Sequence, residues 1–137
     1  MPISSQEDYL LRMLRQMGAV LARMLGLKNG GQVHEALQSL DDAEGELLGP
    51  LAGVAPRVDS ATAAHMVGHP LRLAAWARLQ HERADLLRLA GDAAGGALAA
   101  TRAQELAAEA KARAEGYESD VRELLAPLGN GAVGPSA

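Results

Sequence analysis

Hydrophobic residues near the start of the chain recur at steps of three and four, the spacing that gathers side chains on one face of an α-helix. They are Leu10, Met13, Leu14, Met17, Val20, Leu21, Met24 and Leu25. Ser4 or Ser5 is a suitable N-cap and Asn29-Gly30-Gly31 a suitable stop, so the pattern predicts a helix from about Ser5 to Leu27. Gly18 lies inside this helix at a cost of about 1 kcal/mol relative to alanine, and we expect it to permit close approach of another helix.

The same periodicity, interrupted by glycine and proline, predicts five further helices and one crossover. The helices cover about 32–48, then a short helix capped by Asp59 or Ser60 that ends near Val67, then 70–90, 93–115 and 117–128. Residues 51–58 read as an ordered crossover in which Leu51, Val54 and Val58 are shielded from water. Residues 129–137 have little apolar surface to bury and are expected to form a flexible C-terminal tail after a single domain, 1–128.

The apolar face of each later helix supplies the rest of the expected core. Its members are Val33, Ala36, Leu37, Leu40, Ala43 and Leu47, then Leu73, Trp76, Ala77, Leu79, Ala84 and Leu87, then Ala99, Ala100, Ala103, Ala107 and Ala110, and finally Val121, Leu124 and Leu125. Charged residues of 32–48, among them Glu35, Asp41, Asp42, Glu44 and Glu46, mark its expected solvent face.

Composition excludes a β fold. Of the 66 hydrophobic residues, 28 are alanine and 22 leucine, the two best helix formers, whereas the aromatic residues favoured in sheets number only three. A chain of 137 residues suits one domain. We therefore predict an all-α fold, a compact antiparallel domain of five or six helices.

Charge and cysteine content exclude several functions. The net charge of -4 removes the basic excess that drives binding to nucleic acid, so no nucleic-acid partner is expected. The acidic N-terminus does not resemble a secretory signal, and no apolar stretch approaches 18 residues, so we expect a cytoplasmic chain with no membrane partner. The absence of cysteine rules out disulfides, thiolate nucleophiles and Cys-ligated zinc.

Two helix pairs share a plan. Each has a long helix, a glycine turn at Gly30-Gly31 or Gly91-Asp92, and a second helix with small residues five and twelve positions after the turn glycine. These small residues are Ala36 and Ala43 in the first pair, and Gly96 and Ala103 in the second. The spacing is typical of the tetratricopeptide repeat (TPR), in which small residues allow close helix packing. The expected tryptophan and tyrosine positions hold Gln80 and Leu87, and a plain helical bundle explains the same facts.

A family resemblance adds to this interpretation. The segments Glu7-Asp8-Tyr9-Leu10-Leu11-Arg12-Met13-Leu14-Arg15-Gln16-Met17, Gly31-Gln32-Val33-His34-Glu35-Ala36-Leu37, Glu46-Leu47-Leu48-Gly49 and Val121-Arg122-Glu123-Leu124-Leu125 carry it. The chain resembles, over residues 7–125, a family of uncharacterised bacterial helical proteins with an initial D-Y-(I/L)-x-R-x-(I/L)-x-Q helix. The resemblance implies a TPR-like body after that helix and no catalytic residue.

Few residues suggest chemistry. His65 and His69 have the i, i+4 spacing that can hold a metal on one helix face, but Gly68 and Pro70 indicate that the helix ends between them. We expect capping and surface histidines there. The acidic run from Asp41 to Glu46 scatters around its helix instead of converging, as a solvated face does. No phosphate loop or nucleophile motif is present, so we expect no enzyme activity and no cofactor.

Two features could serve a partner. Residues 51–90 carry five arginines against three acidic residues; Arg72, Arg78 and Arg83, with Trp76, are the candidate partner-binding residues. These arginines could instead pair with acidic neighbouring helices. Met13, Met17 and Met24 could fill the core or form an adaptable homodimer seam. We favour pairing for the arginines and the core for the methionines.

The sequence therefore predicts a non-enzymatic helical protein-interaction module that binds a protein partner or a second copy of itself. The alternative is a small-ligand or metal-binding helical protein, which requires His65, His69 and His81 to converge on one cavity.

Overall fold

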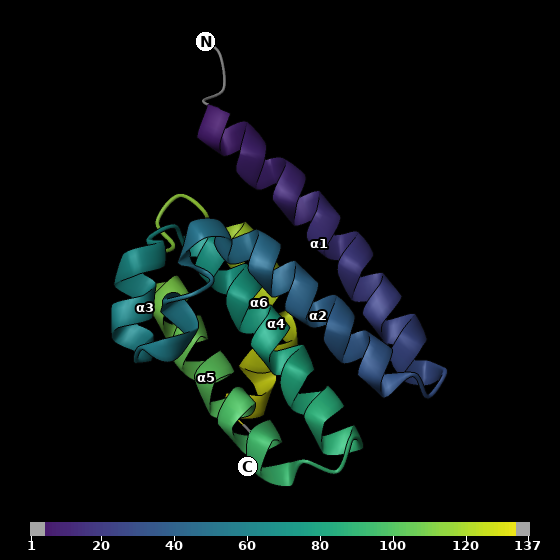
Figure 1. Cartoon of the computed structure of the whole chain (residues 1–137). Helices are drawn as coiled ribbons and strands as arrows, with labels where there is room; N and C mark the ends of the chain where they lie inside the picture. Colours follow the sequence, from purple (N-terminus) through teal and green to yellow (C-terminus); the bar gives the residue numbers. More distant parts are fainter. Residues whose placement is uncertain (1–4, 134–137) are drawn as a thin grey trace.

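The computed structural model describes residues 5–133, and within them the chain forms six α-helices, two short 3₁₀ turns and no strand. In order these are α1 (Ser5–Asn29), α2 (Val33–Leu48), η1 (Gly49–Leu51), η2 (Ala55–Arg57), α3 (Ser60–Val67), α4 (Pro70–Leu89), α5 (Ala93–Ala112) and α6 (Glu118–Val133). Figure 1 shows the helices packed antiparallel in one compact domain. The predicted all-α fold class is confirmed.

The α1–α2 and α4–α5 hairpins turn in the same way. Gly31 and Gly91 adopt φ angles of 78° and 89°, a left-handed conformation that glycine accepts without steric cost. Each glycine N–H donates to the carbonyl three residues earlier, and the next N–H donates to the carbonyl five residues earlier. These are Gly31 to Lys28 and Gln32 to Leu27, then Gly91 to Arg88 and Asp92 to Leu87. Both turns are therefore Schellman motifs, related by a shift of 60 residues.

Helix α4 is the central element of the domain. It lies between α2 and α5, with α6 behind it in Figure 1, and it contacts all five other α-helices. Five consecutive residues, 73–77, are completely buried, so every face of the helix is covered there. A helix buried on all sides shows little amphipathic pattern.

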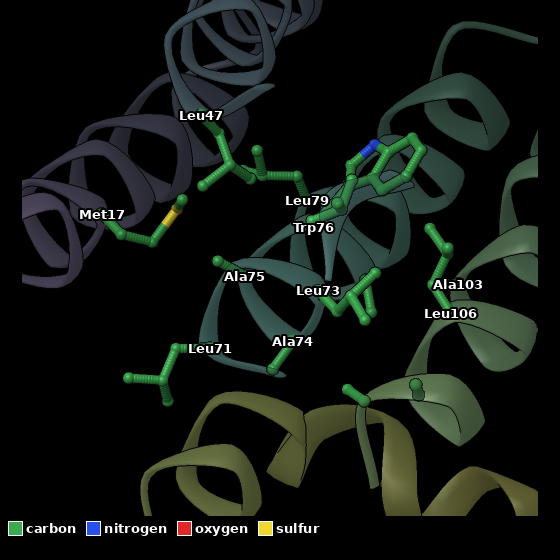
Figure 2. Close-up of a cluster of buried hydrophobic side chains, with 14 of the residues drawn as sticks. Met17, Leu47, Leu71, Leu73, Ala74, Ala75, Trp76, Leu79, Ala103 and Leu106 are labelled. Carbon is green, nitrogen blue, oxygen red and sulfur yellow. The ribbon is translucent and has the colours of Figure 1, made fainter. Parts of the chain in front are cut away.

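Trp76 is the largest buried side chain of the core. In Figure 2, Met17 of α1 and Leu47 of α2 lie on one side of α4, while Ala103 and Leu106 of α5 lie on the other. The small alanines of α5 let it approach α4 closely, and at Gly96 the backbone carbonyl of Ala84 stands only 3.1 Å from where a Cβ would be. The predicted core of this helix pair is confirmed, except that Leu87 and Ala100 are only partly buried.

Helix α3 begins as expected. The Asp59 carboxylate accepts hydrogen bonds from the backbone N–H of Thr62 at 3.1 Å and from its hydroxyl at 2.6 Å. These two hydrogen bonds, the hydroxyl's first, hold the pKa of Asp59 below its ordinary value. Asp59 is thus the N-cap of α3.

Three expectations about packing were wrong. Leu25, predicted in the core, is 55% exposed because α2 and α4 cover only the neighbouring face of α1. Val54 in the crossover is 49% exposed, whereas Leu51 and Val58 pack against the core as predicted. Among residues 5–133 no other helix packs closely on Gly18, since a Cβ built there meets nothing within 4 Å.

The ends of the last two helices also differ from prediction. Helix α5 ends at Ala112 because the next two N–H groups donate to carbonyls three residues earlier instead of four. Arg113 donates to Ala110, and Ala114 donates to Lys111. Helix α6 extends to Val133, past the predicted end at Leu128. Of the predicted tail, residues 134–137 lie outside the described residues.

Candidate interaction surfaces

A polar cluster joins α2 to α4 beside the core. One carboxylate, that of Glu44, accepts three hydrogen bonds: from Trp76 Nε1 at 2.7 Å, from Gln80 Nε2 at 2.7 Å and from Arg83 Nη2 at 2.9 Å. Arg83 Nη1 also donates to Asp41 at 2.8 Å. The cluster satisfies polar groups that the packing of α4 would otherwise leave unpaired.

Glu44 corrects the expectation of a solvated acidic face. Its side chain is only 16% exposed, whereas Asp42 and Glu46 are exposed. The sequence did contain a signal, because Glu44 lies four residues after Leu40 and three before Leu47, both of which are buried. Its position is therefore on the apolar face of α2.

A second cluster ties the crossover to α5. Arg102 donates through Nη1 to the carbonyl of Val58 at 2.7 Å and to the hydroxyl of Ser60 at 3.1 Å, and through Nη2 to the carbonyl of Ala55 at 2.9 Å. Its guanidinium also lies 5.2 Å from the centre of the Trp76 ring, within cation–π range. Sequence analysis did not single out Arg102, since its partners are backbone carbonyls more than 40 residues away.

A groove of about 550 Å³ lies over these two clusters, between α4, α5 and η2. Its lining residues are Pro56, Gln80, Arg83, Leu87, Gly95, Leu98, Ala99, Thr101, Arg102 and Glu105. The polar groups of Gln80, Arg83 and Arg102 are bound to other parts of the domain, as is the Glu105 carboxylate, which accepts from the Ser60 hydroxyl at 2.7 Å. This groove presents one strongly exposed apolar side chain, Leu98, at 74%.

The three candidate arginines each contact a different neighbour of α4. Arg72 lies 5.9 Å from the centre of the Tyr9 ring of α1, Arg78 donates to the carbonyl of Leu124 of α6, and Arg83 binds the carboxylates of α2. Of the three, Arg83 pairs with acidic residues of a neighbouring helix as expected, whereas Arg72 contacts an aromatic ring and Arg78 binds a backbone carbonyl and Glu82 of its own helix. Partner binding by these arginines stays a prediction. Trp76 is completely buried, so its ring does not reach the surface.

His65 lies on α3, whereas His69 and His81 belong to α4, His69 as its N-cap and His81 in its interior. His65 is exposed on α3, and His69 follows the end of that helix as the N-cap of α4, where its Nδ1 accepts from the N–H of Leu71 at 3.1 Å. The His69 ring also packs edge-on against Tyr117, with 4.7 Å between ring centres. Within residues 5–133, His65, His69 and His81 belong to no group of three or more side chains placed to hold a metal ion.

A second groove, of about 270 Å³, opens between α1 and α6 with α4 at its floor. Leu14, Met17, Gly18 and Leu21 of α1 line one wall, Asp120, Glu123 and Leu124 of α6 line the other, and Arg78 of α4 lies between them. The two walls differ in character, since α1 contributes apolar groups and α6 contributes two carboxylates.

Helix α1 carries more apolar surface than the domain covers. Its first stripe, Leu10, Met13, Met17 and Met24, is buried, so these methionines are core residues. A second stripe, Leu11, Leu14, Gly18, Leu21 and Leu25, is offset by one position and has the spacing of a heptad repeat. Leu11 and Leu25 at its ends are 40% and 55% exposed, whereas Leu14 and Leu21 are partly buried against the core and, with Gly18, line the α1–α6 groove. We call this second set the leucine stripe.

Comparisons with known proteins assign no relationship to this chain. A scan against protein-family models, a search of curated proteins and a search of solved structures each found no match. What is shown is an all-helical fold, without assignment to a family or a repeat class. Among the described residues, no helix combines the length and apolar character needed to span a bilayer.

Proposed function

We propose that this domain is a non-enzymatic protein-interaction module that receives an apolar helical segment of a partner on the leucine stripe and in the α1–α6 groove. The observation that carries the proposal is the exposure of Leu11 and Leu25 at the two ends of a stripe whose centre lines a groove. Helix-in-groove recognition uses anchors at this i, i+3, i+7 spacing.

The dimensions of the surface suit a helix. From Leu11 to Leu25 the stripe extends for about 21 Å along α1, at 1.5 Å per residue, or four turns of a partner helix. The opposite wall is acidic, with Asp120 and Glu123 facing the apolar wall of α1. A partner segment with leucine-like anchors and flanking basic residues would complement both walls.

The finer description of the hairpins as TPR-like is also a proposal. It is supported by the two Schellman turns 60 residues apart and by the burial of the small residues at matching positions, namely Ala36, Ala43, Gly96 and Ala103. Stacked helix pairs of this kind leave grooves between helices that other proteins use for peptide binding.

Site-specific photo-crosslinking in the source cells tests the proposed function. A benzoylphenylalanine in place of Leu25 should give a light-dependent adduct of discrete mass, and Leu11→Asp in the same chain should abolish it. Leu98 on α5 is the matched control, since it is also an exposed leucine, at 74%. No adduct at position 25, or an adduct only at position 98, would overturn the assignment to α1.

A further inference from the structure

We propose that His69 is an acid-sensitive switch built into the start of α4. The neutral imidazole caps α4 and packs on Tyr117 beside the start of α6, and protonation of the ring releases both helix starts. The switch is a property of the fold, so it does not depend on the partner surface proposed above.

The capping role of His69 requires the neutral ring. Its Nδ1 accepts the hydrogen bond from the backbone N–H of Leu71 at 3.1 Å. A ring nitrogen that accepts a hydrogen bond carries no proton, so the geometry assigns the tautomer that is protonated at Nε2. A second proton has to go to Nδ1. There it meets the Leu71 N–H, a donor facing a donor, and the cap is lost.

Two further features oppose a positive charge on this ring. The N-terminus of a helix already carries a partial positive charge. Arg72 lies three positions after His69 in the first turn of α4, and its Nε is buried without a hydrogen-bond partner among the described residues. The Arg72 guanidinium faces the Tyr9 ring at 5.9 Å and forms no ion pair with a described side chain. Protonation of His69 therefore adds a charge of the same sign to a corner that is already positive.

The other ionisable groups near this end of α4 are in contact with water. Those on the described parts of α1, α3 and the α5–α6 connection are Asp8, His65, Glu115, Glu118 and Asp120, and all five are exposed. The Glu118 carboxylate accepts from the backbone N–H of Gly116 at 3.0 Å. Exposed charges interact weakly through water, so we expect the cap and Arg72 to determine how the fold responds to the proton.

The His69 ring couples two helices. It packs edge-on against Tyr117 with 4.7 Å between ring centres, one position before α6 begins at Glu118. The carbonyl of Tyr117 accepts from the N–H of Val121 at 2.9 Å, the first hydrogen bond of α6, and the carbonyl of His69 accepts from Leu73 of α4 at 3.0 Å. A change at His69 therefore reaches the helix at the centre of the core and the helix that carries the acidic wall of the α1–α6 groove.

Nuclear magnetic resonance of the ¹⁵N-labelled wild type from pH 8 to pH 5 tests the cap. The ring ¹⁵N shifts should show the Nε2–H tautomer of neutral His69, and the Leu71 N–H resonance should move with the same midpoint as the ring. Amide protection over residues 117–121, corrected for the intrinsic exchange rate, should fall by about fivefold across that midpoint, the loss expected for an N-cap. An Nδ1–H tautomer, or a Leu71 resonance and an α6 start that do not follow the ring, would overturn the proposal.

A pair of matched variants tests the consequence for stability. The unfolded chain takes up a proton on histidine near pH 6.5, whereas the fold holds the neutral His69 ring, so stability should fall as pH drops through that range. His69→Asn keeps a capping oxygen that does not titrate. The urea midpoint of the wild type relative to His69→Asn should be constant above about pH 7.5 and lower by roughly 0.5 M below about pH 6.

His65→Asn is the control, because His65 is an exposed histidine on the neighbouring helix α3. The difference between His65→Asn and the wild type should not vary between pH 8 and pH 5. A difference between His69→Asn and the wild type that is equally flat would overturn the proposal. So would a pH dependence that appears with His65→Asn instead.

Discussion

The indole Nε1–H of Trp76 donates a hydrogen bond of 2.7 Å to Oε2 of Glu44, which lies 32 positions earlier in the chain. The contact joins the centre of α4 to α2. The indole nitrogen is the one polar atom of the Trp76 side chain, which is completely buried. Gln80 and Arg83 donate to the same carboxylate, so one acidic residue satisfies three donors. Glu44 is for this reason a structural residue of the domain.

Removing the Glu44 carboxylate should therefore destabilise the fold. We expect Glu44→Ala to lower the free energy of unfolding by roughly 2–4 kcal/mol, because it leaves the buried indole N–H and the Gln80 amide without their acceptor and removes one of the two carboxylates that Arg83 binds. Urea unfolding followed by the fluorescence of Trp76, the single tryptophan, measures this directly. Glu46→Ala, an exposed acidic position on the same helix, is the control and should change stability by less than about 0.5 kcal/mol. Equal effects of the two changes would contradict the role assigned to Glu44.

The local sequence pattern predicted where the helices of this chain begin and end far better than it predicted which of their side chains are buried. The turns at Gly31 and Gly91 and the cap at Asp59 depend on residues within a few positions, so the sequence shows them directly. The exposure of Leu25 depends on which neighbours cover that face of α1, and periodicity cannot show this, whereas the place of Glu44 between Leu40 and Leu47 did put it on the apolar face of α2. The candidate surface was missed for the same reason: the apolar residues of α1 form two adjacent stripes, and the packing of the domain buries the first and leaves the two ends of the second exposed.

Two helix glycines should respond to alanine in opposite directions. A Cβ at Gly96 would stand 2.9 Å from Arg88 Cγ and 3.1 Å from the Ala84 carbonyl oxygen, and that backbone atom cannot move aside cheaply. We expect Gly96→Ala to destabilise the domain by about 1–3 kcal/mol. A Cβ at Gly45 meets nothing within 4 Å, so Gly45→Ala should stabilise by up to about 1 kcal/mol through helix propensity.

Thermal or urea unfolding of both glycine variants measures the two opposite changes in stability. A stabilised Gly96→Ala would show that α4 and α5 can separate at this point. It would then contradict the close α4–α5 contact as a source of stability.

The cap of α3 should make stability depend on acid pH. Because the folded pKa of Asp59 lies below the ordinary value of 3.8, its ionised form stabilises the domain above that pH, and the contribution is lost as pH falls through the folded pKa. Asp59→Asn keeps a capping oxygen that does not titrate. The difference in unfolding free energy between wild type and Asp59→Asn should stay constant above about pH 5 and shift against the wild type below about pH 4. Urea midpoints measured from neutral to acid pH test this, and a difference that does not vary with pH would contradict it.

Arg102 should control the order of the crossover. Its two Nη atoms bind the carbonyls of Ala55 and Val58, a geometry that the planar guanidinium satisfies and a single ammonium cannot. We expect Arg102→Lys to lower the free energy of unfolding by about 1–3 kcal/mol, since charged hydrogen bonds to part-buried carbonyls are lost. Amide hydrogen exchange should accelerate first over residues 51–58, where the backbone bonds are short-range turns.

The control for Arg102 lies near the end of the same helix. Arg113 binds Glu109 four residues earlier, a partly exposed pair within one segment, so Arg113→Lys should cost less than about 0.5 kcal/mol and leave the exchange of the crossover unchanged. If Arg102→Lys behaved like Arg113→Lys, the crossover would be held by the packing of Leu51, Ala55 and Val58 alone. A selective loss of protection over residues 51–58 would instead show that a long-range contact from α5 orders a segment that carries no α-helix of its own.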